Sequence, residues 1–367
     1  MQRSFPTLAR TMRRVNKIPR YEENETDMRF VFRDWRALFL AVFLWPASLM
    51  GAEPIEPVVS TWRVGGELNT FYTDNVSHFS ASQRLTLLED PTQPILDAPS
   101  QGRSFVVEPL IQATRSYLPA WGRMDVAIRA QGFIFENNPR FNHGTFGTQL
   151  TQALPAETLL RFRYHYGPNM LLGDHLESRL GESRIGAERV TTHFGAIELE
   201  RKVFDNLVVR LLNRYGTRSY NEPFSQRDTF FWTLGTHMEW EFSPGVTFML
   251  GYHLERGLAK GRKQPEFGED VSSYIHYVEA EIVARVTDRI SIRCGVDFEK
   301  TSFTSSLPDD DFRDAHDTTV QGEIEGRYAL TQGIDLTLGY LRSQGRLTFE
   351  RDLTIVNTVW IGSAFRF

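Results

Sequence analysis

Cysteine is almost absent from this 367-residue chain, which contains Cys294 alone. A single cysteine excludes an internal disulfide framework and a haem site of the C-x-x-C-H type, and the scarcity of cysteine fits passage through an oxidising compartment. Long hydrophobic runs are also scarce. Hydrophobic residues make up 41% of the chain, and the only strongly apolar run lies near the N-terminus. The composition therefore excludes a protein built from several transmembrane helices.

The one apolar run, residues 37–45, has the features of a secretory signal. It spans nine residues and follows three arginines, whereas a spanning helix needs roughly 20 residues. Small residues come after it and predict cleavage behind Ala52. We therefore expect residues 1–52 to be an N-terminal extension and signal peptide. Met28 is a candidate for the true start, and a long basic region before the signal is the alternative.

Basic charge is in deficit once this segment is removed. Residues 1–52 carry nine Lys and Arg and five Asp and Glu, so the remaining chain has 32 basic and 41 acidic side chains and a net charge near −9. We expect no nucleic-acid partner, because such partners bind basic surfaces. One repeating rhythm continues from residue 58 without a linker. Residues 53–367 are therefore expected to form a single domain.

Apolar and polar residues alternate with a period of two through this domain. In the clearest unit, Thr229 to Leu254, apolar side chains share one parity on both sides of the turn at residues 243–245, with Phe231 as the exception. This pattern predicts a β-hairpin whose two faces meet different surroundings. Similar alternation predicts strands at 62–72, 105–113, 124–134, 146–152, 160–166, 185–200 with a bulge near Val190, 207–213, 278–286, 290–298, 320–330, 334–340 and 355–367.

The connections between these strands alternate in length, and about fourteen strands result, with about 12 or 16 also compatible with the pattern. The predicted fold is all-β, a transmembrane antiparallel up-and-down β-barrel, because lipid-facing strands must leave no open edge. A soluble β-sandwich or β-solenoid is the alternative, but its strands are usually about five or six residues long. Long polar loops are expected at 76–103, 137–143, 167–182, 217–227, 257–270, 301–315 and 342–352.

The end of the chain supplies a second signal. Its last strand is amphipathic, and the apolar parity includes Phe365 and Phe367. With the export signal and the alternating strands, this ending resembles the closing strand of bacterial outer-membrane β-barrels, whose last residues are read by the barrel-assembly machinery. The resemblance implies location in the outer membrane of a Gram-negative bacterium, contact with outer-membrane lipid and lipopolysaccharide, and an assembly signal at Phe365 and Phe367. It identifies no subfamily.

Many charged residues occupy the parity opposite to the apolar one. If the apolar parity faces lipid, these side chains point into the barrel. The candidates for a pore lining are Arg161, Arg163, His165, Arg210, His237, Glu239, Glu241, Glu279, Glu281, Arg285, Arg293, Asp297, Glu299, Glu323, Glu325 and Arg327.

We therefore expect an outer-membrane pore that passes small solutes, or an exported polymer, through a charged lumen. An excess of carboxylates in the C-terminal half favours cations weakly over anions. The first alternative is a non-conducting scaffold barrel for a periplasmic or surface partner, such as a polysaccharide-export complex, a cytochrome or a lipoprotein. The second is a barrel enzyme that acts on lipid or glycan.

Other chemistry has little support in the sequence. No nucleophile and base stand out by their spacing, so we expect no enzyme activity, no catalytic residue and no cofactor. The acidic run Asp309-Asp310-Asp311 lacks EF-hand spacing, so no metal site is expected. Cys294 falls on the apolar parity, where it need not be reactive. Aromatic residues expected at the membrane interfaces are Trp62, Trp121, Trp232, Trp240, Trp360, Tyr252 and Tyr340.

Overall fold

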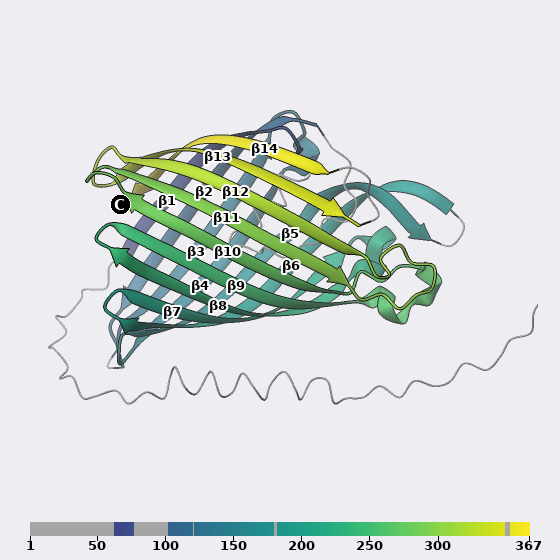
Figure 1. Ribbon diagram of the computed structural model, residues 1–367, viewed down its shortest axis with the longest axis horizontal. Coiled ribbons are helices and arrows are strands. Elements are labelled where there is room, and N and C mark those ends of the chain that lie inside the picture. Colours follow the sequence, from purple (N-terminus) through teal and green to yellow (C-terminus); the bar gives the residue numbers. More distant parts are fainter. Residues whose placement is uncertain (1–61, 77–101, 120, 180–181, 349–352) are drawn as a thin grey trace, which may run out of the picture. The chain divides into compact units, whose positions relative to one another are not determined.

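A computed structural model gives the fold of the chain as a closed antiparallel β-barrel (Figure 1). Each strand pairs with its neighbours in the sequence, and the first pairs with the last, so the prediction of an all-β barrel of about fourteen strands is confirmed. The predicted signal in residues 1–52 lies outside the described residues. The structure describes residues 62–76, 102–119, 121–179, 182–348 and 353–367.

Fourteen strands and four short 3-10 helices make up the described fold. Within these ranges, no helix has the length and hydrophobicity needed to cross a membrane. The strands are β1 (Trp62–Thr73), β2 (Ser104–Tyr117), β3 (Met124–Phe135), β4 (His143–Leu154), β5 (Thr158–Arg179), β6 (Glu182–Phe204), β7 (Leu207–Tyr220), β8 (Thr229–Ser243), β9 (Val246–Ala259), β10 (Ser273–Arg285), β11 (Ile290–Phe303), β12 (His316–Ala329), β13 (Ile334–Leu347) and β14 (Thr354–Arg366). The helices are η2 (Pro139–Phe141), η3 (Glu222–Arg227), η4 (Lys260–Lys263) and η5 (Pro265–Phe267).

The alternating sequence becomes two faces of the barrel wall. On β11, the side chains of Val296 and Phe298 are 57% and 40% exposed, whereas Asp297 and Glu299 between and beyond them are each 7% exposed. The same contrast recurs along the other strands, so the apolar parity forms the outer surface and the polar parity the interior. A hydrophobic outer surface is stable only against an apolar surrounding such as lipid.

The barrel closes where β1 meets β14. Their register runs from Gly65 opposite Arg366 to Thr73 opposite Thr358. Val64 and Phe367 extend the pairing with two backbone hydrogen bonds, of 3.1 and 2.8 Å. No backbone edge therefore remains at this seam.

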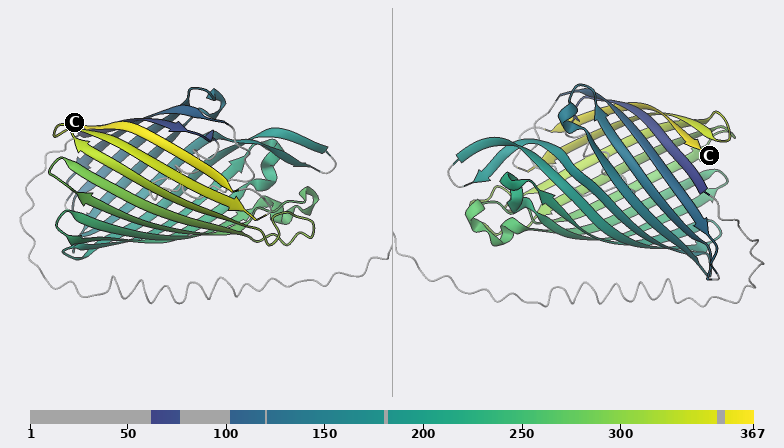
Figure 2. Two further views of the ribbon diagram at one scale, coloured as in Figure 1. Left: turned by 45° about the horizontal axis from the view of Figure 1, so that its top comes forward. Right: turned by 180° about the vertical axis from the view of Figure 1, so that it is seen from behind.

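The two ends of the barrel differ (Figure 2). At one end, here called the turn end, short turns join the strands, and Gly245 between β8 and β9 adopts the left-handed conformation (φ 81°) that suits glycine. At the other end, here called the loop end, longer connections contain η2 to η5. Short turns at one rim and long loops at the other are typical of outer-membrane barrels.

The longest hairpin corrects one sequence-based expectation. Residues 167–182 were predicted to form a loop, but β5 and β6 continue through most of this range and project beyond the barrel at the loop end (Figure 1). The register shifts twice between Gly167 and Gly173, opposite Val190 and its neighbours, where a bulge was expected. Pro168 and these irregularities interrupt the alternation, although the pairing of the two strands resumes beyond them.

Candidate functional site

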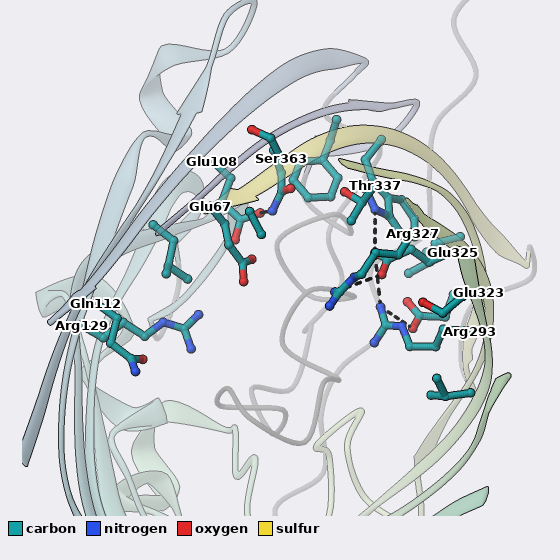
Figure 3. Close-up of a pocket in the computed structure, with 18 residues that line it drawn as sticks. Glu67, Glu108, Gln112, Arg129, Arg293, Glu323, Glu325, Arg327, Thr337 and Ser363 are labelled. Carbon is teal, nitrogen blue, oxygen red and sulfur yellow. Dashed lines mark hydrogen bonds and ion pairs between the residues drawn. The ribbon is translucent and has the colours of Figure 1, made fainter. Parts of the chain in front are cut away.

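The interior of the barrel contains open space that reaches the turn end. A cavity of about 540 Å³ lies between the walls formed by β1–β3 and by β10–β14 (Figure 3). A second cavity of about 560 Å³ lies beside Arg366 and Phe367, and Gln112 lines both cavities. A third, of about 200 Å³, shares Gln112 and Arg129 with the first. All three cavities are lined by Gln112, and together they are here called the lumenal region, between the turn end and the middle of the barrel.

The wall formed by β5, β6 and β7 carries an excess of arginine. Arg161 donates two hydrogen bonds, of 2.8 and 3.0 Å, to Glu200, which also accepts one of 2.7 Å from Arg210. Two residues farther along the same strands, Arg163 Nη1 lies 2.9 Å from Glu198 Oε1. Three guanidinium groups thus share two carboxylates, and this cluster has a positive net charge.

The wall formed by β10, β11 and β12 has the opposite balance. Arg293 lies 3.4 Å from Glu281, 3.1 Å from Glu323 and 3.7 Å from Glu325. Arg327 also approaches Glu325, at 3.5 Å. Three carboxylates share two guanidinium groups in this cluster, and Figure 3 shows Arg293, Glu323, Glu325 and Arg327 facing the cavity. The two walls therefore differ in the balance of their acidic and basic side chains.

All sixteen predicted lining residues lie on strands, on the parity opposite to the apolar outer face. The structure brings Arg161, Arg163 and Arg210 together in one cluster and Glu281, Arg293, Glu323, Glu325 and Arg327 in the other. His165 stacks on Phe194, and His237 contacts His253. Glu279, Asp297 and Glu299 lie on the acidic wall. Glu239, Glu241 and Arg285 lie near the turn end, outside both clusters.

Sequence reasoning missed part of the interior. Glu198 and Glu200, which hold the arginines of β5, were not proposed because the irregular pattern around Val190 obscured the parity of β6. Glu198 and Glu200 are two residues apart on a strand that ends in a short turn, and side chains with this spacing lie on the same face. This spacing could have identified them from the sequence. Further inward residues that were missed are Glu67, Glu108, Arg129, Arg214, Arg218 and Glu255.

A deeply buried ion pair lies on the wall formed by β7, β8 and β9. Arg218 Nη1 is 2.9 Å from Glu255 Oε1, and the two side chains are 2% and 0% exposed. Thr233 donates a hydrogen bond of 2.9 Å to the other oxygen of Glu255. The guanidinium group also lies 4.0 Å from the ring centroid of Phe231. This cation-π contact explains why an aromatic residue interrupts the polar parity of β8.

Toward the loop end, part of the lumen wall becomes apolar. Trp360 belongs to this part, and its placement contradicts the expectation that it lies at the membrane interface. The side chain is buried inside the barrel, and Nε1 donates a hydrogen bond of 3.2 Å to Glu325. Trp360 shares the inward parity of β14 with Thr358. The cluster consists of Phe71, Val76, Val106, Phe133, Phe135, Phe141, Leu171, Leu341 and Trp360.

Gly339 makes room for the Trp360 ring, because a Cβ atom added there would overlap it. We predict that Gly339→Val displaces the ring, breaks the hydrogen bond to Glu325 and lowers barrel stability by about 1–3 kcal/mol, the usual cost of overpacking. Tryptophan emission and the denaturation midpoint measure both effects. Gly326→Val is the matched control, since its Cβ would meet only the Leu338 carbonyl, at 3.9 Å. Unchanged emission in Gly339→Val would contradict the predicted displacement.

At the loop end, buried charges join three segments of the chain. Arg227 of η3 lies 2.7 Å from Glu188 of β6 and 2.5 Å from Glu269, which precedes β10. His175 of β5 also contacts Glu188. Burial acts to lower the pKa of Arg227, but attraction to both glutamates outweighs it and raises this pKa. Burial acts to raise the pKa of Glu188, but Arg227 and His175 hold it below its usual value.

The acidic run near Asp310 supports the loop that contains it. Asp310 is buried and accepts backbone hydrogen bonds from Asp270, at 2.8 Å, and Phe312, at 3.1 Å. Burial raises its pKa, although these hydrogen bonds act in the opposite direction. Among the described residues, no group of three or more His, Cys, Asp and Glu side chains is arranged to hold a metal ion. Cys294 is exposed on the outer face.

The two phenylalanines expected to form an assembly signal lie at the turn end. Phe367 is 82% exposed, and the ring centroids of Phe365 and Phe367 are 5.8 Å apart. Their main chains continue the pairing with β1. The rings therefore stand on the outer surface beside the seam of the barrel.

Comparisons with known proteins address the fold. No protein-family model and no curated protein matches the chain. Among solved structures, the outer membrane channel DcaP of Acinetobacter baumannii matches with a TM-score of 0.50 and 8% identity, over 87% of this chain and 100% of that one. An anion-selective porin from Comamonas acidovorans matches with a TM-score of 0.43 and 8% identity, over 84% and 99%. With its closed barrel and its likeness to DcaP, this chain has the fold of a bacterial outer-membrane β-barrel, of no identified subfamily.

Proposed function

We propose that this protein is an outer-membrane channel through which small hydrophilic solutes diffuse passively. The observation that carries the proposal is the lumenal region itself, whose cavities are lined by polar and charged side chains and continue to the turn end. Small barrels of about eight strands are filled by their own side chains, whereas larger barrels can enclose a channel. In this arrangement the loop end faces the outside of the cell and the turn end faces the periplasm.

The charges of the lumen would set its selectivity. A solute that passes between the arginine-rich wall and the acidic wall meets charges of opposite sign on its two sides, which orients a dipolar molecule. Two of the carboxylates around Arg293, those of Glu323 and Glu325, border the cavity of about 540 Å³. We therefore propose a modest preference for cations over anions.

Single-channel recording of the refolded domain, residues 53–367, tests the channel and its selectivity. Stepwise currents are expected, and Glu323→Lys should shift the reversal potential in a salt gradient toward anions, because it removes a carboxylate and adds a cation at the cavity. Glu323→Gln should give about half of that shift. Asp288→Lys, in an exposed turn, is the control, and its effect should be small because charges farther away than about 10 Å are largely screened at 0.1 M salt.

A non-conducting scaffold is the second candidate. It is favoured by the apolar cluster around Trp360 and by the buried charges around Arg227, which fill space toward the loop end. A barrel that folds, shown by altered migration in unboiled gels, but carries no current would exclude the open channel and support the scaffold. For either function, we propose that Phe365 and Phe367 bind the barrel-assembly machinery.

A further inference from the structure

The outer surface of five adjacent strands, β9 to β13, carries a group of basic side chains near the loop end. On β11, the outward apolar run from Ile290 to Phe298 spans nine residues, and Lys300 is the next outward residue. A strand needs about 9–11 residues to cross a membrane, so Lys300 lies where the apolar layer ends. This group, here called the outer basic belt, consists of Arg256, His276, Lys300, His316, Arg342 and Arg346.

Strand register aligns the belt into rows. His276 lies opposite Lys300, which lies opposite Thr318, which lies opposite Arg346. These positions form one row across β10 to β13. Neighbouring strands are about 4.8 Å apart, so the row places Lys300 beside His276 and, with Thr318 between them, two strands away from Arg346, all just above the apolar surface. Arg342 is outward on β13, four residues before Arg346.

A second row lies farther toward the loop end. Arg256 is opposite Tyr274, and His316 is opposite Ser302. The Arg256 guanidinium lies 4.3 Å from the ring centroid of Tyr274 and donates a hydrogen bond of 2.9 Å to Thr304. Packing therefore holds this cation in place, whereas Lys300 and the arginines of β13 are exposed to a ligand.

The belt is uniform in sign and confined to one side of the barrel. Among the described outward positions of β9 to β13 at this level there is no Asp or Glu. On the other side, the next residues of outward parity beyond Tyr72, Phe105 and Ile134 are Asp74, Arg103 and Glu136, which are exposed and carry both signs. A general need for charge at the membrane surface is met by charges of both signs, as on that side, and does not account for a group of one sign.

We propose that the outer basic belt binds the phosphate groups of lipid A, the membrane anchor of lipopolysaccharide. Lipid A carries phosphates on its sugar headgroup directly above its acyl chains. Its phosphates would pair with the basic side chains just above the apolar wall. Its acyl chains would pack on the outward residues below, such as Val278, Phe298 and Val320. Anionic phospholipid shares the negative charge but lacks the paired phosphates on a rigid disaccharide. The orientation rests on the proposed outer-membrane location and not on conduction.

The test titrates the folded domain, residues 53–367, in detergent with bisphosphorylated lipid A, dephosphorylated lipid A and phosphatidylglycerol, and measures binding by native mass spectrometry. Bisphosphorylated lipid A should bind at least about tenfold more tightly than the other two, since each cation near a charged surface contributes roughly a factor of five. The triple variant K300S/R342S/R346S should bind it about 100-fold more weakly. Raising the salt from 0.1 to 1 M should weaken wild-type binding, because the screening length falls from about 10 to about 3 Å.

The matched control is R123S/K202S/R289S, which removes three cations near the turn end and should bind lipid A as the wild type does. The conservative variant K300R/R342K/R346K should also retain binding. Altered migration in unboiled gels verifies that each variant folds. Equal binding of dephosphorylated lipid A or of phosphatidylglycerol, or an equal loss in the turn-end control, would overturn the proposal. Because none of these measurements uses current, a silent channel would leave the result unaffected.

Discussion

Replacing Arg227 with methionine should loosen the loop end while the barrel stays closed. The substitution leaves Glu188 and Glu269 buried without their shared guanidinium group. Removing one partner of a buried ion pair typically costs about 3–5 kcal/mol. We expect the backbone amides of η3 and of the outer parts of β5 and β6 to exchange hydrogen faster. The increase in rate should correspond to this loss of free energy. The amides of β8 to β13 should keep their wild-type exchange rates. Hydrogen exchange with mass spectrometry measures both.

Arg313→Met is the matched control for Arg227→Met, since Arg313 also lies in a loop at this end but pairs with Asp314 on the exposed surface. Exposed pairs contribute about 0–1 kcal/mol, so its exchange should change little. In the wild type, the depressed pKa of Glu188 means that this stabilisation is present above about pH 4.5 and is lost as the pH falls through the folded pKa. The difference in loop-end stability between the wild type and Arg227→Met should therefore become smaller in acid. An equal difference in stability at pH 7 and pH 4 would contradict the role assigned to the ionised Glu188.

Arg218→Met should destabilise the barrel itself. Glu255, which is 0% exposed, would keep its hydrogen bond from Thr233 but lose its ion pair. The expected loss is again about 3–5 kcal/mol, and it should appear as a lower urea midpoint for the change in gel migration. Methionine preserves much of the volume beside Phe231, so the loss reports charge more than packing.

The double variant Arg218→Met with Glu255→Gln separates these causes. It replaces both charged groups with uncharged ones. Replacing a whole buried ion pair in this way often changes the free energy of unfolding little. The double variant should therefore recover most of the stability that the single variant loses. If single and double variants have the same urea midpoint, Arg218 acts through its packing on Phe231 and not through its charge.

Much of the barrel wall was predictable because one chemical rule acts at every strand. Lipid outside and water inside impose a period of two, and strands such as β11, with Val296 and Phe298 outward and Asp297 inward, display it without interruption. The rule fails where a strand leaves the membrane. Beyond Gly167, β5 and β6 pair with each other and have no lipid to face, and the sequence predicted only the β6 side of this hairpin, at 185–200.

Pairings across the lumen were less predictable than the faces. Parity states that Arg293 points inward, but it cannot state that three glutamates from two other strands converge on it, since that depends on register. Trp360 shows the opposite error. Aromatic residues near strand ends usually belong to the membrane interface, and only its parity with Thr358 indicates that it faces the interior. The contacts of Arg227 depend on how η3, β6 and the segment before β10 meet, which no local pattern encodes.

The seam between β1 and β14 has a consequence for the order of folding. Gly65 pairs with Arg366, so this contact joins residues separated by nearly the whole domain. Contacts between distant residues form late and slowly, because a long loop of chain must close first. The hairpins from β2 to β13 need only local contacts, but the cylinder cannot close until β14 pairs with β1. Until then, β1 presents an open edge that can pair with other chains and aggregate.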